Sequence, residues 1–354
     1  MKTIRDIAKI AGVGVSTVSR AINNHPDINQ ETKDKIMEVI RENNYIPNNS
    51  ARNLKRLNSD TIAVLIKGIT NPFFSKMIGV FEEETKKKDY SFILQRVREN
   101  ENELEIAIEL VKEKRLKGII FLGGSLACSK EQVSQLDVPF VLSTSGATSE
   151  YAQLEAENWA SVSVDDYAES YKMTDYYCSS GHKRIALIAA CKNDCGIGKQ
   201  RLEGYKAALK DHGIEFDESL VVYMDGDRDE YSIETGYRLM KQLMKQVKDF
   251  TAVFAIADSL AIGALRALFE AGKKIPEEIS VSGFDGIDMG AYYTPSLTTI
   301  RQPVEELAET TVRLLFELID QGGQYRKEIL PGELLIREST MARSEDDITT
   351  GQGD

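Results

Sequence analysis

Short apolar runs alternate with longer amphipathic stretches over most of the chain, from Thr61 onward. The runs are nearly continuous and β-branched, which is typical of strands buried on both faces. They lie at 62–66, 92–94, 118–122, 140–142, 162–164, 185–189, 220–223, 252–256, 281–284 and 297–300. Helical stretches lie between most of them, at 73–88, 101–114, 166–180, 201–212, 233–248, 259–271 and 304–321. The alternation predicts an α/β fold with two doubly wound parallel-sheet subdomains.

The first 46 residues have a different, all-helical pattern. Thr3 is placed to cap a helix over residues 4–10, and Gly12 and Gly14 permit a tight turn before a second helix over 15–22. Asn29 is placed as the N-cap of a third helix. The apolar residues expected to face inward are Ile7, Ile10, Ala11, Val18, Ala21, Ile22, Ile36, Val39 and Ile40. The outer face of the second helix then presents Val15, Ser16, Ser19 and Arg20.

The charge of the chain is unevenly distributed. The net charge is −12, but residues 1–59 hold ten Lys/Arg and six Asp/Glu, a net of +4, against −16 for the rest. A basic head on an acidic body allows the head alone to approach phosphates. No apolar run reaches the ~18 residues of a membrane helix, and the start has no secretory pattern, so we expect a cytoplasmic protein without a membrane partner.

Two helices joined by a glycine turn are typical of a helix-turn-helix DNA-binding domain. A helix fits the major groove, where Arg20 can bind a guanine edge through two hydrogen bonds. Ser16 and Thr17, at the start of the helix, can donate to phosphates or bases. The alternative at this point is a small three-helix cap with a solvated Ser/Thr face.

The start of the chain resembles the LacI/GalR family of bacterial transcriptional regulators. The residues that carry the resemblance are "IRDIAKIAGVGVSTVSRAIN" (4–23), "ETKDKI" (31–36) and "YIPNNSARNL" (45–54). The resemblance implies a helix-turn-helix domain over 1–46, with Val15, Ser16 and Arg20 reading bases, and with Thr17, Ser19 and Asn23 contacting phosphate. Thr3 belongs to the same expected DNA surface.

The resemblance also implies a hinge helix and linker over 47–60. Leu54 lies where the family inserts a leucine into the minor groove, and such an apolar wedge kinks DNA. Two turns of helix without a partner are too short to be stable in water, so this segment is expected to fold when docked. Further DNA contacts expected here are Asn48, Ala51, Arg52 and Lys55. Two heads and two wedges imply a homodimer on a near-palindromic double-stranded operator.

Weaker motifs extend the resemblance to an effector domain over 61–340, similar to periplasmic sugar-binding proteins. They are "NPFF", "SGHKRIALI", "RLEGY", "AIADSLAIGAL", "VSGFDG" and "LTTIRQP". The N-subdomain is expected at about 61–161 and 294–321, and the C-subdomain at about 162–293 and 322–340. Crossovers then fall near Val162, Tyr293 and Gln321. The polar tail, 341–354, is expected to be disordered.

Ligands of open α/β sheets bind beyond the carboxyl ends of the strands. Candidate effector-binding residues at such places are Asn71, Phe73, Phe74, Arg201, Asp258 and Asp285, with Asp165, Trp159 and Tyr231 as weaker candidates. The alternative for Asp258 and Asp285 is a helix N-cap, and for Arg201 a plain surface residue. The resemblance implies that Arg201, Asp258 and Asp285 hold effector hydroxyls. The effector is expected to be a sugar or sugar derivative, with a purine or nucleoside as the alternative.

Enzyme and cofactor motifs are missing from the sequence. "CGIGKQ" (195–200) lacks the spacing of a P-loop, and neither a dinucleotide fingerprint nor a nucleophile elbow is present. The three histidines are not clustered, and Cys191 and Cys195 lack a second ligand pair for zinc. His182 is expected to be a hydrogen-bonding residue of a turn. We therefore expect a repressor without metal, cofactor or catalysis; a solute-binding protein and an α/β enzyme such as a sugar kinase remain the alternatives.

Overall fold

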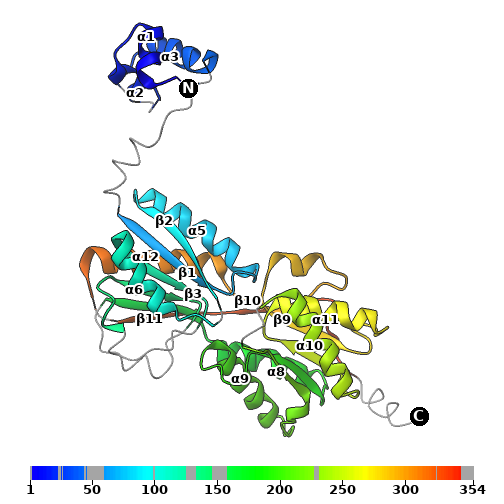
Figure 1. The fold of residues 1–354 in the computed structure, drawn as a ribbon. Helices are drawn as coiled ribbons and strands as arrows, with labels where there is room; N and C mark the ends of the chain where they lie inside the picture. Colours follow the sequence, from blue (N-terminus) through cyan, green and yellow to red (C-terminus); the bar gives the residue numbers. More distant parts are fainter. Residues whose placement is uncertain are drawn as a thin grey trace. The chain divides into compact units, whose positions relative to one another are not determined.

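The computed structural model describes residues 2–22, 25, 27–43, 45, 60–98, 100–124, 133–145, 158–226, 231–323 and 325–343. The chain divides into two compact units, Met1–Ser59 and Asp60–Asp354. Figure 1 shows a small helical unit at the N-terminal end and a larger α/β unit. In the described part of the chain, each helix is too short or too polar to cross a membrane.

The first unit is built from three helices, α1 (Ile4–Ala11), α2 (Val15–Ile22) and α3 (Gln30–Glu42). Thr3 and Asp6 form a capping box at the start of α1, and Asn29 accepts a hydrogen bond from Glu31 N at the start of α3. Gly12 ends α1 in the left-handed conformation, with a φ of 71°. The predicted caps and the glycine turn are therefore confirmed.

The core of this unit contains Ile7, Ala8, Ala11, Val18, Ala21, Ile36 and Tyr45. The prediction that Ile10 faces inward is wrong, since this side chain is 49% exposed. Ala8 completes the buried stripe with Ile7 and Ala11. At about 100° per residue, Ile10 is turned about 200° away from Ala8 around the helix axis.

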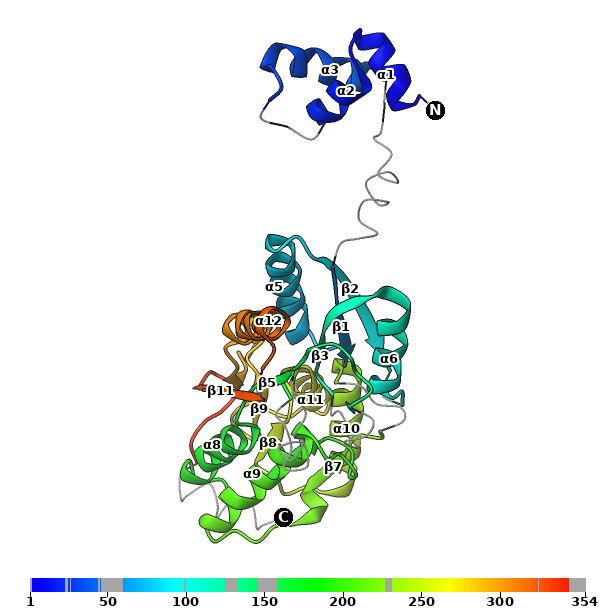
Figure 2. The same cartoon turned by 90° about the vertical axis from the view of Figure 1, so that its left-hand side faces the viewer.

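The second unit contains two six-stranded sheets. The first has the order β11-β5-β4-β3-β1-β2 and carries what we call the N-subdomain. Its strands are β1 (Thr61–Lys67), β2 (Ser91–Val97), β3 (Leu116–Leu122), β4 (Phe140–Ser143), β5 (Trp159–Val164) and β11 (Arg326–Leu330), all parallel. In Figure 2, α5 (Phe73–Lys87) and α12 (Val304–Gln321) cover one face, and α6 (Glu103–Lys114) covers the other.

The second sheet has the order β12-β10-β9-β8-β6-β7 and carries the C-subdomain. Its strands are β6 (Ile185–Ala189), β7 (Val221–Tyr223), β8 (Ala252–Ala255), β9 (Ser280–Asp285), β10 (Thr298–Arg301) and β12 (Glu333–Leu335), of which only β12 pairs antiparallel. The helices of this half are α8 (Asp166–Ser179), α9 (Ile197–Asp211), α10 (Ile233–Gln246) and α11 (Asp258–Glu270). Two short 3-10 helices lie at Glu218–Leu220 and Asp288–Tyr292. The predicted α/β architecture with two doubly wound sheets is confirmed.

The chain crosses between the two sheets at one predicted point and at two others. β5 belongs to the first sheet and ends at Val164, so the crossover predicted near Val162 is confirmed. β10 pairs with β9 in the second sheet, so the crossover expected near Tyr293 lies after Arg301. The third expected crossover, near Gln321, is also wrong, because β11 returns to the first sheet and the chain crosses between Leu330 and Glu333.

The start of the predicted tail is packed against the C-subdomain. Both ring nitrogens of buried His182 are engaged, Nδ1 with the Thr251 hydroxyl at 2.9 Å and Nε2 with the Met341 carbonyl at 3.1 Å. Arg343 N donates to the Ser180 carbonyl at 2.7 Å. His182 is thus the predicted hydrogen-bonding residue of a turn, and the prediction of disorder is wrong for 341–343. Residues 344–354 lie outside the described residues.

Candidate functional site

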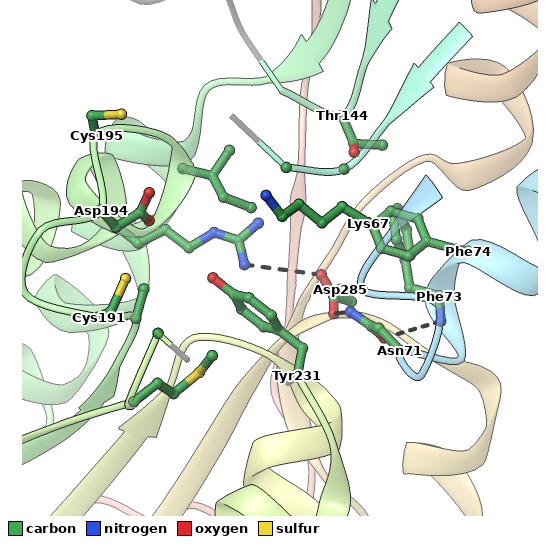
Figure 3. A pocket seen from close by; sticks show the side chains of 18 of the residues that line it. Lys67, Asn71, Phe73, Phe74, Thr144, Cys191, Asp194, Cys195, Tyr231 and Asp285 are labelled. Carbon is green, nitrogen blue, oxygen red and sulfur yellow. Dashed lines mark hydrogen bonds and ion pairs between the residues drawn. The ribbon is translucent and has the colours of Figure 1, made fainter. Parts of the chain in front are cut away.

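A cavity of about 570 Å³ is lined by residues of both subdomains. Figure 3 shows its walls, formed by loops that follow strand ends, as expected for sheets of this type. Five of the predicted effector-binding residues line it, namely Asn71, Phe73, Phe74, Arg201 and Asp285. Tyr231, a weaker candidate, also lines it.

Asn71 connects the two subdomains across this cavity. The residue lies in the loop between β1 and α5, and its Nδ2 donates to Asp285 Oδ2 at 2.9 Å. Its Oδ1 accepts from the backbone N–H of Phe73 at 3.1 Å, which orients the amide at the start of α5. Both polar ends of the buried side chain are therefore used, one locally and one across the cavity.

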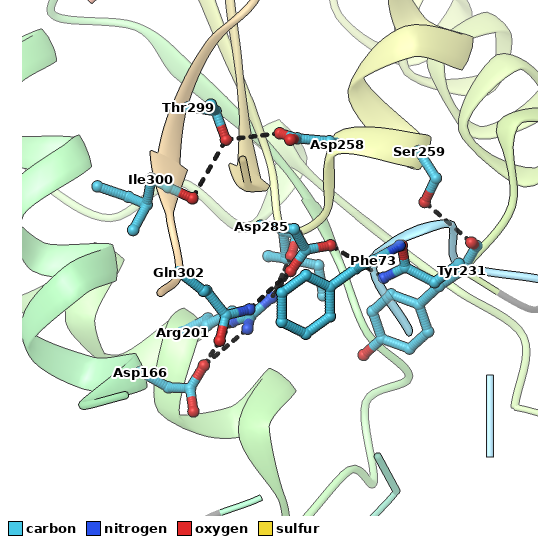
Figure 4. A network of polar contacts seen from close by, with 12 residues as sticks. Phe73, Asp166, Arg201, Tyr231, Asp258, Ser259, Asp285, Thr299, Ile300 and Gln302 are labelled. Carbon is cyan, nitrogen blue, oxygen red and sulfur yellow. Dashed lines mark hydrogen bonds and ion pairs between the residues drawn. The ribbon is translucent and has the colours of Figure 1, made fainter. Parts of the chain in front are cut away.

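Arg201 is held within a buried network of polar groups (Figure 4). Its Nε donates to Asp166 Oδ1 at 2.8 Å, Nη1 donates to the Ile256 carbonyl, and the guanidinium lies 3.5 Å from the ring centroid of Phe284. The distance from Nη1 to Asp285 Oδ1 is 4.0 Å. The guanidinium is therefore fixed with its plane oriented before any ligand enters.

Asp285 lies at the end of β9 with a φ of 121°, a region that residues with a side chain rarely adopt. Its carboxylate accepts from Asn71 and, at 2.9 Å, from Gln302 Nε2. Burial raises the pKa of Asp285 to about 6, although Arg201 and these two amides oppose the shift. Backbone strain and a shifted carboxyl in one cavity are typical of a ligand-binding residue.

Three predicted candidates do not line the cavity. Asp258 is fully buried behind it as the first residue of α11, where it accepts from the Ile287 N–H at 2.8 Å and the Thr299 hydroxyl at 2.6 Å. Burial, followed by the charge of Asp285, raises the pKa of Asp258 to about 8. Asp165 caps α8 by accepting from Ala168 N at 3.0 Å. Trp159, another of the weaker candidates, stacks on Tyr325 in the core of the N-subdomain.

Sequence reasoning missed several residues of the cavity wall. Lys67, Asn100 and Thr144 line it on the N-subdomain side, and Asp194 and Asp225 on the C-subdomain side. Lys67 ends β1, Thr144 follows β4 and Asp225 follows β7 closely. Their position directly after strands was a usable signal, whereas Asp194 lies five residues beyond the end of β6 and is less clearly marked.

The outer face of α2 is the second candidate site. Val15, Ser16 and Arg20 are exposed, while Thr17 and Ser19 are half-buried. Thr3 is exposed, and its side chain serves the capping box of α1. The other predicted DNA contacts, Asn23, Asn48, Ala51, Arg52, Leu54 and Lys55, lie outside the described residues, as does nearly all of the predicted hinge. Within the described part of the chain, no group of His, Cys, Asp and Glu is arranged to hold a metal ion.

Both units match known protein families. Residues 3–48 match the bacterial regulatory proteins of the lacI family, and residues 174–340 match the periplasmic binding protein-like domain. The transcriptional regulator MalR of Clostridium butyricum is 41% identical over 95% of this chain and 98% of its own. The transcriptional repressor PurR of Pasteurella multocida is 31% identical over 97% and 100%.

Solved structures share the fold. The transcriptional regulator CelR in complex with cellobiose has a TM-score of 0.67 and 26% identity, over 96% of this chain and 100% of its own. The lac repressor dimer bound to operator and the anti-inducer ONPF also has a TM-score of 0.67, with 24% identity over 96% and 99%.

Proposed function

The chain belongs to the lacI family of bacterial regulatory proteins, and we propose that a sugar or sugar derivative in the Arg201–Asp285 cavity sets its affinity for operator DNA. The protein is a DNA-binding transcriptional regulator with a periplasmic-binding-protein-like effector domain. The observation that carries the proposal is the orientation of Arg201, Asp285 and Asn71 toward one cavity lined by both subdomains.

The chemistry of the cavity suits a polyol. Charged groups make short, directional hydrogen bonds with hydroxyls, and here both signs are present, with Arg201 as donor and Asp285 as acceptor. Phe73 and Phe74, whose ring centroids lie 5.5 Å apart, offer apolar surface to the face of a sugar ring. The volume lies within the ~300–1,000 Å³ of small-molecule sites.

A purine or nucleoside is the second candidate effector. Phe73 and Tyr231 line the cavity and can stack on a planar base, and the relative PurR is a repressor of similar length and 31% identity. A sugar is preferred because it carries several hydroxyls that can bind the charged and polar groups of the lining, Arg201, Asp285 and Asn71. A planar base uses mainly the aromatic faces.

The proposed mechanism links the cavity to α2. The outer face of α2 enters the major groove, where Arg20 contacts a guanine and Ser16 a neighbouring base or phosphate. Two copies of the chain occupy the two halves of a near-palindrome in the cytoplasm; the lac repressor is likewise bound to its operator as a dimer. Effector binding changes the angle between the subdomains and thereby the spacing of the two heads.

We propose binding without turnover at this cavity. Asp166, Arg201, Asp285 and Asn71 are bonded mainly to one another, an arrangement that fixes a ligand but supplies no activated nucleophile. In this proposal the effector is bound and released unchanged, and the chain acts on DNA as a repressor. A kinase or hydrolase would consume the sugar, so unchanged ligand recovered after incubation is the expected result.

The test is a thermal-shift screen of sugars and nucleosides, followed by operator binding. Ligand in excess of its dissociation constant raises the melting temperature, because it binds only the folded state. The operator is selected from random duplexes, and its affinity is measured by fluorescence anisotropy with and without each hit. Stabilisation by nucleosides alone would favour the second candidate, and a hit that leaves operator affinity unchanged would refute regulation through this cavity.

A further inference from the structure

Lys67 is the one charged residue on the N-subdomain wall of the cavity, among the residues that the structure describes. It is the last residue of β1, and its aliphatic stem lies over Gly124, where an added methyl group would be 3.1 Å from Lys67 Cδ. Figure 3 shows the ammonium end projecting into the cavity. Within the described part of the chain, this ammonium has neither an ion-pair nor a hydrogen-bond partner.

Thr144 lies on the same wall with an unused hydroxyl (Figure 3). The side chain is only 5% exposed, and its Oγ1 has no hydrogen-bond partner among the described residues. Thr144 also has a φ of 67°, which is a genuine outlier for a β-branched residue. A buried hydroxyl without a partner costs about 1–3 kcal/mol, so its persistence at a cavity wall indicates a ligand.

Among the described residues, this wall offers hydrogen-bond donors and no carboxylate. Lys67 supplies three N–H donors, and Thr144 and the exposed Asn100 can each donate as well. The carboxylate of Glu103 lies beside Gly124 but does not line the cavity. The carboxylates of the lining, Asp194, Asp225 and Asp285, belong to the opposite wall.

We propose that the effector carries an anionic group, a phosphate or a carboxylate, which binds Lys67 and Thr144, while its hydroxyls face Arg201 and Asp285. This inference rests on the proposed function, since it assigns the chemical class of the same effector. A neutral sugar can accept hydrogen bonds from both groups, but it leaves the charge of the ammonium uncompensated. An anion satisfies both through charge-assisted hydrogen bonds, which are about twice as strong as neutral ones.

A competing role for Lys67 is to pair with Asp194 or Asp225 across the cavity when the subdomains close. In that case the ammonium would assist every ligand equally, charged or not. The two roles are therefore separated by comparing anionic and neutral ligands on the same variant.

The experiment uses the full chain and matched ligands. Dissociation constants are measured by calorimetry for glucose, glucose 6-phosphate and glucuronate, for ribose and ribose 5-phosphate, and for maltose and maltose 6′-phosphate. The phosphate and carboxylate members distinguish the two sources of the charge. The variants are Lys67→Met, Thr144→Val and, as a control for loss of a lysine from the same subdomain, Lys112→Met, an exposed residue of α6.

The expected result is that, in at least one set, an anionic member binds at least tenfold more tightly than its neutral parent. Lys67→Met should remove that advantage by weakening the anionic member at least tenfold more than its parent, Thr144→Val should reduce it, and Lys112→Met should preserve it. Tighter or equal binding of every neutral parent would overturn the inference while leaving the proposed function intact. An equal loss for both ligand classes in Lys67→Met would also overturn it, in favour of cross-cavity pairing. If sugars of both classes fail to bind, the proposed function fails and the inference with it.

Discussion

The hydrogen bond between Asn71 and Asp285 is the most direct test of coupling between the subdomains. Asn71→Ala removes the 2.9 Å bond from the N-subdomain amide to the C-subdomain carboxylate. It also removes the acceptor of the Phe73 N–H at the start of α5. The rest of the carboxylate's environment, including Gln302 and Arg201, stays in place.

The size of the effect follows from the type of bond. A hydrogen bond to a charged group contributes about 1.5–3 kcal/mol, and 1.4 kcal/mol is a factor of ten in an equilibrium constant. The closed arrangement of the subdomains should therefore lose about 10–100-fold in population relative to the open one. Because an effector that bridges both walls requires closure, its apparent affinity should fall by a similar factor.

The assay measures the ratio of operator affinities with and without saturating effector. In Asn71→Ala this ratio should move toward one, since the effector can no longer bias the subdomain angle as strongly. Gln302→Ala is the matched control, because Gln302 donates to the same carboxylate at the same 2.9 Å from the end of β10 within the C-subdomain. Gln302→Ala should weaken effector binding but keep the ratio. Equal ratios in the two variants would refute the bridging role of Asn71.

Three further predictions concern the head, the buried acid and the helix packing. Arg20→Ala should lower specific operator affinity by about 1–3 kcal/mol per half-site without changing effector affinity, measured by anisotropy and calorimetry; equal loss of both would contradict the division of roles. Burial raises the pKa of Asp258 from 3.8 to about 8. The stability that the protonated carboxyl contributes is therefore fully present below pH ~4, falls between pH ~4 and ~8, and is lost as the pH rises through ~8. Asp258→Asn should therefore gain stability relative to wild type between pH 4 and 8 in urea titrations, and a constant difference would contradict the shift. Gly204→Ala should lower the free energy of unfolding by about 1–3 kcal/mol, because the new methyl group would lie 2.2 Å from the Tyr167 carbonyl oxygen. Gly79→Ala, on an open face of α5, is the control and should raise it by about 0.5–1 kcal/mol. Urea titrations that show changes of the same sign in both variants would refute the packing argument.

The fold was largely predictable because periodicity reports burial. The continuous apolar runs correspond to strands with helices on both faces, and alternate residues of β1 divide between two cores, Ile62 and Val64 in one and Ala63 and Leu65 in the other. β11 and β12 were missed because they are short edge strands with exposed, charged residues such as Arg326 and Glu333. An edge strand buries little, so its sequence carries little hydrophobic signal.

Sheet membership was not predictable from the same signal. The run at 297–300 indicates a strand but not which sheet it joins, since both sheets bury equally apolar strands. Pairing of β10 with β9 depends on the path of the chain through the 3-10 helix Asp288–Tyr292, which local patterning does not encode. The boundary of the N-subdomain was therefore displaced by one whole strand.

The same reasoning explains which site residues the sequence revealed. Asn71 and Asp285 directly flank strands or helices within recognisable motifs, and both were identified. Asp258 has the same kind of position, yet its side chain turns toward Thr299 and Ile287 rather than toward the cavity. Position after a strand fixes only the edge of the sheet on which a residue lies. The direction of the side chain is decided by the partners that the fold supplies.

Lys67 and Thr144 show the converse case. Neither belongs to a motif, and a lysine at the end of a strand is ordinarily a solvated surface residue. What distinguishes them is that neither has a hydrogen-bond partner among the described residues although both line the cavity. This property of the fold appears only when β1 and β4 lie in the same sheet with β3 between them. Motif residues therefore identify the family, whereas the residues that select this chain's own effector must be found from unsatisfied groups in the folded protein.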